Sequence, residues 1–331
     1  MKKSIFLFLL VSLFANSPIA HADPYFKGKV ISMMVGFAPG GGYDLMSRIL
    51  AKHLPKYIPG KPVIIVQNLP GASGVLVANN LYNTAKPDGL TIGVIDRGLP
   101  LAQLLKSKGV KYDMRKFAWV GSMAVETTIM ALRSSIPYKN FNDVLHSKTP
   151  IFLGCTGVGD SAAQFDALLQ EFAGLKANLV TYHSSADEML AIERNEIDGR
   201  SGSYSALKRY IANGLIRPFV RGSVSEPGIE NLPIDESLVS DTKAKTIMAL
   251  RSSSGKVGRP FIAAPGTPEH IMVTLRDAFA KAAKDPNVQE EAQKMMIRIE
   301  YLPAKDCLDV MNFIMNQPDS IVNEASKYIK F

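Results

Sequence analysis

The sequence predicts an α/β protein built from two doubly wound lobes that face each other across a cleft. The first observation is an alternation of strand and helix patterns between residues 30 and 95. The second is a strand, a glycine-rich loop and a helix between residues 151 and 172, which repeats the pattern that opens the chain. The third is an apolar return segment, residues 259–264, followed by helical patterns. Such alternation is typical of parallel sheets that helices cover on both faces.

The first 22 residues have the pattern of a secretory signal peptide. Lys2 and Lys3 form a basic start, and the apolar run of residues 5–14 is too short to span a membrane. Ala20-His21-Ala22 matches a cleavage site, so we expect an exported protein that is cleaved after Ala22.

Composition favours a globular protein of two ordinary domains. Of the 331 residues, 47% are hydrophobic and 21% are charged. The net charge is +8, but Lys and Arg are scattered without a block of five, which argues against nucleic acid as a partner.

Neither a metal nor a cofactor is expected. The histidines after the signal segment are dispersed, without a metal-ligand spacing. Cys155 and Cys307 are the two cysteines, and their spacing does not imply a disulfide, although an exported protein could form one.

The first glycine-rich loop is the strongest candidate for a binding site. An apolar strand, residues 30–37, precedes it and a helix, residues 44–57, follows. The unpaired N–H groups of a helix start attract anions, and glycines let a ligand approach the backbone. A plain turn is the alternative, and a P-loop is excluded because Lys and Ser/Thr do not follow the glycines. The candidate residues are Phe37, Ala38, Pro39, Gly40, Gly41, Gly42, Tyr43 and Asp44.

Two further strands complete the first half. Residues 62–68 have the apolar centre of a buried parallel strand, a helix starts at Val75, and residues 90–95 form a third strand. Ligands of such sheets bind beyond the carboxyl ends of the strands, which adds the loop of residues 96–100 to the site. In this loop, beside Gly98, Arg97 is placed to bind an acidic ligand. The alternative is that Arg97 forms an ion pair with Asp96 or is a surface charge.

The second half repeats this organisation. Residues 127–136 read as a strand that crosses between the lobes, and a short helix at 141–146 precedes a strand at 151–155. After the second glycine-rich loop come a helix at 162–172, a strand at 179–182, a helix at 185–194 and a strand end that opens into a loop at 197–204. Serine hydroxyls could donate to a ligand, whereas Asp160 would repel an anion and could instead cap its own helix. The candidate residues here are Gly157, Val158, Gly159, Asp160, Ser161, Tyr182, Ser201 and Ser203.

The last third predicts the hinge. A strand at 216–220 and a helix near 236–250 precede the return strand, and strong helices from Pro268 to Tyr328 should pack on the first lobe. The first lobe would then comprise residues 23–126 and 265–331. The second would comprise residues 127–264, including two hinge strands suited to closure on a ligand.

Six segments together resemble the periplasmic receptors of the tripartite tricarboxylate transporter family, the Bug group. They run in family order over nearly the whole mature chain and comprise residues 37–44, 68–74, 86–91, 154–159, 197–199 and 264–268. The resemblance implies a type II periplasmic binding protein fold. It also implies a small carboxylate held by main-chain amides and ordered water from loops 38–44 and 157–161, and delivery to a membrane permease with a large and a small subunit. With the signal segment, we expect a periplasmic protein, and we expect it to be a monomer.

Three departures from the family pattern border the predicted cleft. Tyr43 stands where the family usually has Thr, Asp160-Ser161-Ala162 replace a region with His, and Tyr182-His183-Ser184 replace Tyr-Lys-Gly. The particular ligand is therefore left open, and both an aromatic acid and a dicarboxylate fit a pocket that Phe37, Tyr43, Tyr204 and Arg97 would shape.

Two other functions remain as alternatives. A ligand sensor that signals to a membrane kinase would need the same fold and site. An exported enzyme is less favoured, because the chain has no Gly-x-Ser-x-Gly motif and no metal spacing.

Overall fold

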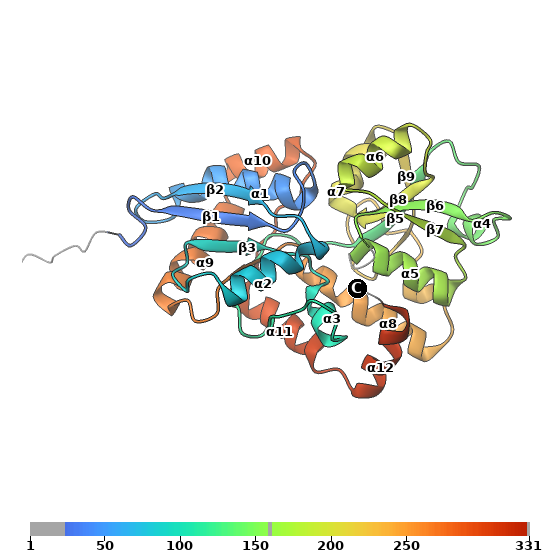
Figure 1. Cartoon of the computed structure of the whole chain (residues 1–331). Helices are drawn as coiled ribbons and strands as arrows, with labels where there is room; N and C mark the ends of the chain where they lie inside the picture. Colours follow the sequence, from blue (N-terminus) through green and yellow to red (C-terminus); the bar gives the residue numbers. More distant parts are fainter. Residues whose placement is uncertain (1–23, 158–160, 330–331) are drawn as a thin grey trace, which may run out of the picture.

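The computed structural model describes residues 24–157 and 161–329, which form two lobes side by side (Figure 1). Each lobe contains one sheet with helices packed on it. The predicted class, two α/β lobes with a cleft between them, is confirmed.

The first lobe is organised on a six-stranded sheet with the order β11-β4-β10-β3-β1-β2. Three of its strands are parallel and form the predicted βαβαβ unit: β1 (Val30–Val35), β2 (Val63–Asn68) and β3 (Thr91–Val94). The return strand β10 (Pro260–Ala263) is antiparallel to β3 and to β4 (Ala118–Ser122), and β11 (Leu302–Pro303) adds the edge. Its helices include α1 (Gly42–His53), α2 (Val75–Asn83), α3 (Leu99–Leu104), α9 (Glu269–Ala283), α10 (Pro286–Lys294) and α11 (Ala304–Met315).

The second lobe is organised on a five-stranded sheet with the order β7-β6-β8-β5-β9. β6 (Ile151–Cys155) is parallel to β7 (Ala177–Thr181) and β8 (Gly199–Ser203), whereas β5 (Thr128–Arg133) is antiparallel to β8 and to β9 (Ile216–Arg221). Its helices include α4 (Phe141–Leu145), α5 (Ser161–Ala173), α6 (Ser185–Glu193) and α7 (Tyr204–Ala212).

The segment at 62–68 is a parallel strand as predicted, but the expectation that it is buried is wrong. β2 lies at the edge of its sheet, where Val63 is 60% exposed and Ile65 is 46% exposed. Ile64 and Val66 on the opposite face pack on the core of the first lobe. An apolar run predicts a strand, but it does not indicate whether both faces of that strand are covered by helices.

The segment at 197–204, expected as a strand end that opens into a loop, instead contains a complete strand that is followed at once by a helix. Residues 199–203 are β8 itself, and α7 begins at the next residue, Tyr204. Glycine and serine, which usually mark loops, are used here because the strand is closely packed. A Cβ on Gly199 would lie 2.3 Å from the carbonyl oxygen of Ala131 on the neighbouring strand.

Within residues 24–157 and 161–329, the chain passes between the lobes three times. Residues 123–127 join β4 to β5, and the chain returns through α8 (Thr242–Ser253) and η4 (Ser254–Val257) to β10. The sequence predicts β10 to be a hinge strand of the second lobe, but it is paired within the sheet of the first lobe. A third passage joins α11 to α12 (Asp319–Tyr328).

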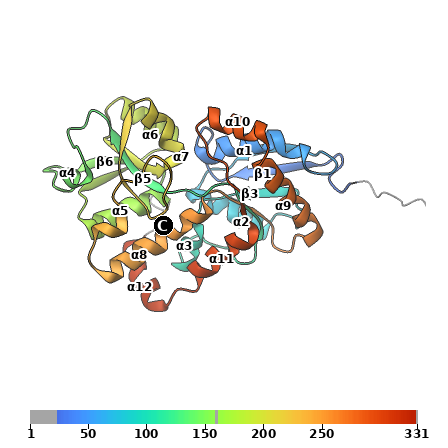
Figure 2. The ribbon, with the colours of Figure 1, turned by 180° about the vertical axis from the view of Figure 1, so that it is seen from behind.

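The expectation that the last helices all pack on the first lobe is wrong for α12. This helix packs on α5 and α8 (Figure 2). The ring centroid of Tyr328 lies 4.8 Å from that of Phe172. Its apolar residues follow a helical pattern that favours burial on any apolar surface, and the pattern does not identify which lobe supplies that surface.

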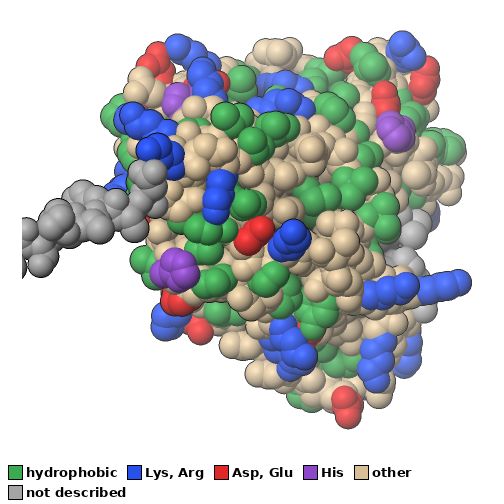
Figure 3. All heavy atoms as spheres, turned by 60° about the vertical axis from the view of Figure 1, so that its left-hand side comes forward, with side chains coloured by type: hydrophobic (Ala, Val, Ile, Leu, Met, Phe, Trp, Pro, Cys, Tyr) green, Lys and Arg blue, Asp and Glu red, His purple; other side chains and the backbone are tan. Residues whose placement is uncertain are grey.

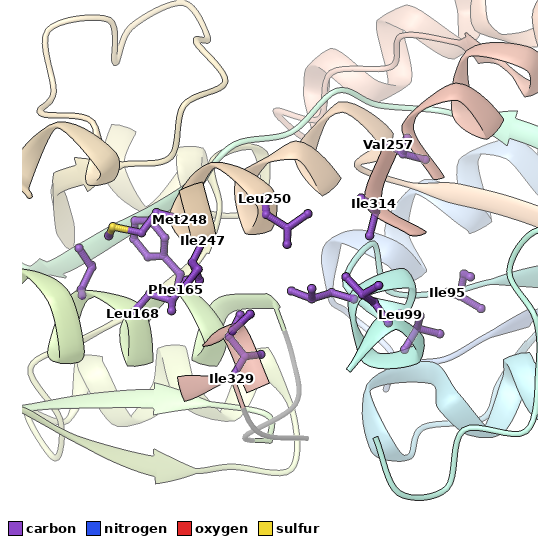
Figure 4. Close-up of a cluster of buried hydrophobic side chains, with 14 of the residues drawn as sticks. Ile95, Leu99, Phe165, Leu168, Ile247, Met248, Leu250, Val257, Ile314 and Ile329 are labelled. Atoms are coloured by element: carbon purple, nitrogen blue, oxygen red, sulfur yellow. The ribbon is translucent and has the colours of Figure 1, made fainter. Parts of the chain in front are cut away.

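The two lobes share one continuous hydrophobic core. Figure 4 shows Ile95 and Leu99 of the first lobe on one side of this cluster and Phe165 and Leu168 of the second lobe on the other, with Leu250 between them. Each lobe also has a core of its own. The lobes are thus joined by packed side chains as well as by the crossing segments.

The remaining global features concern charge, cysteines and membranes. On the face in Figure 3, Lys and Arg side chains are scattered among hydrophobic and uncharged ones. Cys155 and Cys307 are both buried, and they are not joined by a disulfide. Within the described ranges, no helix is long and apolar enough to cross a bilayer, and no group of His, Cys, Asp or Glu could hold a metal ion.

Candidate ligand-binding site

A cavity of ≈ 470 Å³ lies between the lobes. Its walls are formed where strands of both sheets end: Gly36 and Phe37 follow β1, Asp96 follows β3, and Thr156 follows β6. This is the position at which open parallel sheets bind ligands. The volume suits a small organic molecule.

Four helices begin at the wall of this cavity, two of them with uncapped first turns. Residues at the starts of α1, α5, α6 and α7 line it: Gly42, Ser161, Ser185 and Ser203. Gly41 and Ser203, the residues before α1 and α7, make no side-chain hydrogen bond to the helix start. The Tyr204 N–H of α7 already donates to the carbonyl oxygen of Thr127, so the first turn of α1 offers the clearer donors. The positive dipole ends of helices from both lobes nevertheless converge on one space, which favours an anion.

Five of the eight residues predicted in the first loop line the cavity, and three do not. The lining residues are Phe37, Ala38, Gly41, Gly42 and Tyr43, whereas Pro39, Gly40 and Asp44 lie outside the lining.

Asp44 holds the loop in shape. Its carboxylate is buried and accepts hydrogen bonds from the Gly40 N–H at 2.9 Å, Asn68 Nδ2 at 2.8 Å and Arg48 Nε at 3.0 Å. Burial acts to raise the pKa of Asp44, but the hydrogen bonds from Arg48, Gly40 and Asn68 outweigh it and hold the pKa below its usual value. The acid that follows the glycines is thus a structural brace of the cavity wall.

Tyr43 connects the first loop to the hinge. Its ring is stacked on Phe37 at 4.5 Å, and the guanidinium of Arg259 lies 4.3 Å from its centroid. Its hydroxyl lies 3.3 Å from both Asp96 Oδ2 and the carbonyl oxygen of Gly258. Burial, with a further contribution from Asp96, raises the pKa of Tyr43 far above its usual value, so the phenol stays protonated and can donate.

The candidates in the second lobe divide in the same way. Ser161, Tyr182 and Ser203 line the cavity, whereas Gly157 and Ser201 do not. Ser161 Oγ lies 3.5 Å from Asp96 Oδ2 of the first lobe, and Ser201 Oγ donates to Asp166 Oδ1 at 2.5 Å. The predictions for Val158, Gly159 and Asp160 lie outside the described residues.

Arg97 lies behind the cavity wall, where it bridges the lobes. Its Nη1 donates to Ser203 Oγ at 3.1 Å and its Nη2 to Thr128 Oγ1 at 2.7 Å. It is buried, so it is not a surface charge, and it does not line the cavity. Its neighbour Gly98 also lies outside the lining and donates its N–H to Asp96 Oδ1 at 2.6 Å.

Two arginines that the sequence analysis did not select line the cavity. Arg200 on β8 forms an ion pair with Glu188 at 2.8 Å, and Arg259 forms one with Glu126 at 3.1 Å. A signal was present for Arg200, because it directly precedes the selected serines. Arg259 opens the return strand and carried no such signal. Four further lining residues, Asp96, Ala162, His183 and Ser184, belong to segments that the sequence placed at or beside the cleft, although they were not selected as candidates. The lining residues that were missed altogether are Gly36, Pro70, Gly71, Ala72, Ser73, Thr156, Thr181, Ser185, Gly202 and Ala206.

A buried pair of carboxylates lies where the chain crosses between the lobes. Glu126 Oε1 accepts from Ser205 Oγ at 2.5 Å and from Arg259 Nε at 3.2 Å. Glu226 accepts the N–H of the next residue, Thr127, at 2.8 Å. Burial raises the pKa of Glu226 to about 7, and the nearby charge of Glu126 adds to this rise.

This carboxylate predicts a pH dependence of stability. The folded-state pKa of Glu226 is about 7, above the ordinary 4.5, so its protonated form stabilises the fold below pH 4.5 and this contribution is lost as pH rises through 7. The urea midpoint of wild type should therefore fall between pH 4.5 and pH 7, and it should fall less in Glu226→Gln. Asp235, with its pKa raised to about 6 mainly by burial, contributes in the same direction and remains in the variant. Parallel pH profiles for wild type and variant would contradict the assignment.

Two lobes, a hinge and an anion-attracting cavity between them define a solute-binding receptor of the periplasmic binding protein class. The family model described as "Tripartite tricarboxylate transporter family receptor" matches residues 46–326, and the chain belongs to this family.

Known relatives agree with this assignment. A UPF0065 protein of Bordetella pertussis is 25% identical over 312 residues, covering 93% of this chain and 91% of the relative. The periplasmic binding protein BugD superposes with a TM-score of 0.75 at 19% identity, over 92% of this chain and 100% of BugD. MatC from Rhodopseudomonas palustris, solved with bound malate, superposes with a TM-score of 0.72 at 20% identity, over 90% and 100% of the two chains. These structures show the shared fold.

Proposed function

We propose that this receptor captures a small carboxylate in the cavity between its lobes and delivers it to a tripartite membrane transporter. The observation that carries the proposal is the convergence of four helix starts on one cavity of ≈ 470 Å³. The malate in MatC supports the same class of ligand. The family to which the chain belongs consists of solute receptors, so capture and release, rather than catalysis, is the proposed role.

The surroundings of the receptor are part of the proposal. The basic start and apolar run of residues 1–22 support export to the periplasm with cleavage after Ala22. Family membership supports a membrane permease as the partner, for which we propose a large and a small subunit, with the receptor acting as a monomer.

A thermal-shift screen tests the choice of ligand. Ligand-stripped protein is heated with malate, succinate, adipate, citrate or benzoate, and at least one acid should raise the melting temperature, because a ligand at 100 times its Kd stabilises the native state by about 2.7 kcal/mol. The matched control is succinamide, which has the shape of succinate without its charges. If no acid shifts the transition, or if succinamide matches succinate, the proposed carboxylate specificity is wrong.

A further inference from the structure

We propose that Arg259 is the cationic contact for the ligand, a guanidinium that binds the ligand's carboxylate at the start of α1. This inference rests on the proposed function and assigns the charge recognition to one residue. Arg259 precedes β10, far along the chain from the glycine loop that it faces.

The hydrogen bonds of Arg259 leave one side of its guanidinium available. Its Nε donates to Glu126 Oε1 at 3.2 Å, and its Nη2 donates to Ser205 Oγ at 3.2 Å. Among residues 24–157 and 161–329, no group accepts a hydrogen bond from Nη1. The residue is only 2% exposed, yet it lines the cavity. A buried guanidinium with a donor at the wall of a cavity is arranged to receive an anion.

The glycine at position 42 supports this placement. A Cβ there would lie 2.5 Å from Arg259 Nη2 and 3.0 Å from Nη1. Gly42 is a helical residue, so its backbone does not require glycine. The missing side chain instead leaves room for the guanidinium directly over the first turn of α1. The N–H groups of that turn and Nη1 of Arg259 therefore border the same space.

The orientation of the guanidinium is fixed from three directions. Tyr43 of the first lobe lies under its plane, Glu126 of the crossing segment holds Nε, and Ser205 of α7 in the second lobe accepts from Nη2. Such fixing lowers the entropy that a flexible side chain loses on binding. It also places the ligand's charge at a residue that touches both lobes and the hinge.

The charges in the lining agree with an anionic ligand. Among the described lining residues, the guanidiniums of Arg200 and Arg259 outnumber the single carboxylate, Asp96. The Asp96 carboxylate is already engaged by the Gly98 N–H at 2.6 Å. Glu126 offsets the charge of Arg259, so the helix dipole and the first-turn N–H groups contribute to holding a second anion.

Isothermal titration calorimetry of Arg259 variants tests the inference. Wild type, Arg259→Gln and Arg259→Lys are titrated with malate, succinate, adipate, citrate and benzoate. For each acid that wild type binds, we expect Arg259→Gln to weaken binding by at least about tenfold, because a charge-assisted hydrogen bond is lost. Arg259→Lys keeps the positive charge but lacks the paired donors of a guanidinium, so its affinity should lie between those of wild type and Arg259→Gln.

A second pair of variants guards against misfolding. The double variant Arg259→Gln/Glu126→Gln leaves no unpaired charge from this ion pair and should still bind at least about tenfold more weakly. Gly42→Ala, which pushes a methyl group into the guanidinium, should also weaken binding with Arg259 unchanged. The matched control is Arg221→Gln: Arg221 is equally a buried arginine, it donates to the carbonyl oxygens of Gly222 and Glu230, and it does not line the cavity. This variant should melt earlier but keep wild-type affinity.

The outcomes separate the two proposals. If wild type binds none of the acids, the proposed function fails, and this inference fails with it. If wild type binds an acid and the folded Arg259 variants bind it equally well, the function stands and the role of Arg259 is overturned. Equal weakening in Arg221→Gln would likewise overturn it, because the effect would then reflect general loss of packing.

Discussion

Replacement of Glu126 by alanine is expected to lower the free energy of unfolding by about 3–5 kcal/mol. The variant removes the carboxylate that lies 3.1 Å from Arg259, whose residue is only 2% exposed. An unpaired buried charge strongly destabilises the folded state. Ser205 Oγ would lose its acceptor as well. Urea denaturation followed by circular dichroism measures the change.

Two comparisons separate charge from packing. Glu126→Ala/Arg259→Met removes both charges and should recover much of the loss. Asp277→Ala breaks the surface pair with Lys281, whose side chains are more than half exposed, and should cost at most about 1 kcal/mol. A cost for Glu126→Ala as small as that of Asp277→Ala would contradict the account in which Glu126 is the required partner of buried Arg259.

Phe165→Ala is expected to destabilise both lobes together, by about 3–5 kcal/mol. Phe165 lies on α5 of the second lobe and is 1% exposed, within the core that both lobes share (Figure 4). The only tryptophan of the chain, Trp119, is on β4 of the first lobe and belongs to the same cluster. Its fluorescence should therefore report the loss at the same urea concentration as far-UV circular dichroism.

Phe313 offers a matched control for this measurement. It lies on α11 and is 56% exposed, so Phe313→Ala should change stability by no more than about 0.5 kcal/mol. A tryptophan transition that stays at the wild-type midpoint in Phe165→Ala, while circular dichroism shifts, would mean that the lobes unfold separately despite their contact.

Local pattern was sufficient to predict most of the architecture. The run from β1 to β3 has apolar strands, turn residues and amphipathic helices in immediate succession, so its parallel pairing followed from the sequence. The same reasoning placed the glycine loop of residues 37–44 at a strand end. The positions of Phe37, Gly42 and Tyr43 in the cavity lining agree with it.

Features that depend on distant segments could not be read in this way. The edge position of β2 depends on the absence of a further strand beside it, and the place of α12 depends on an apolar surface supplied by α5 and α8. Arg97 and Arg259 show the same limit for the site. Both are arginines near strands, and the sequence around them does not distinguish their roles. In the folded structure, Arg97 contacts Thr128 behind the cavity wall, whereas Arg259 lies against Gly42 at the cavity.

The packing of α12 on α5 and α8 has a consequence for biosynthesis. This helix is synthesised well after α5, and until it docks, Phe172 and neighbouring apolar residues of that earlier segment lack their cover. Packing of this part of the structure therefore waits for the synthesis of α12, which contributes Ala325 to the hydrophobic cluster that the two lobes share.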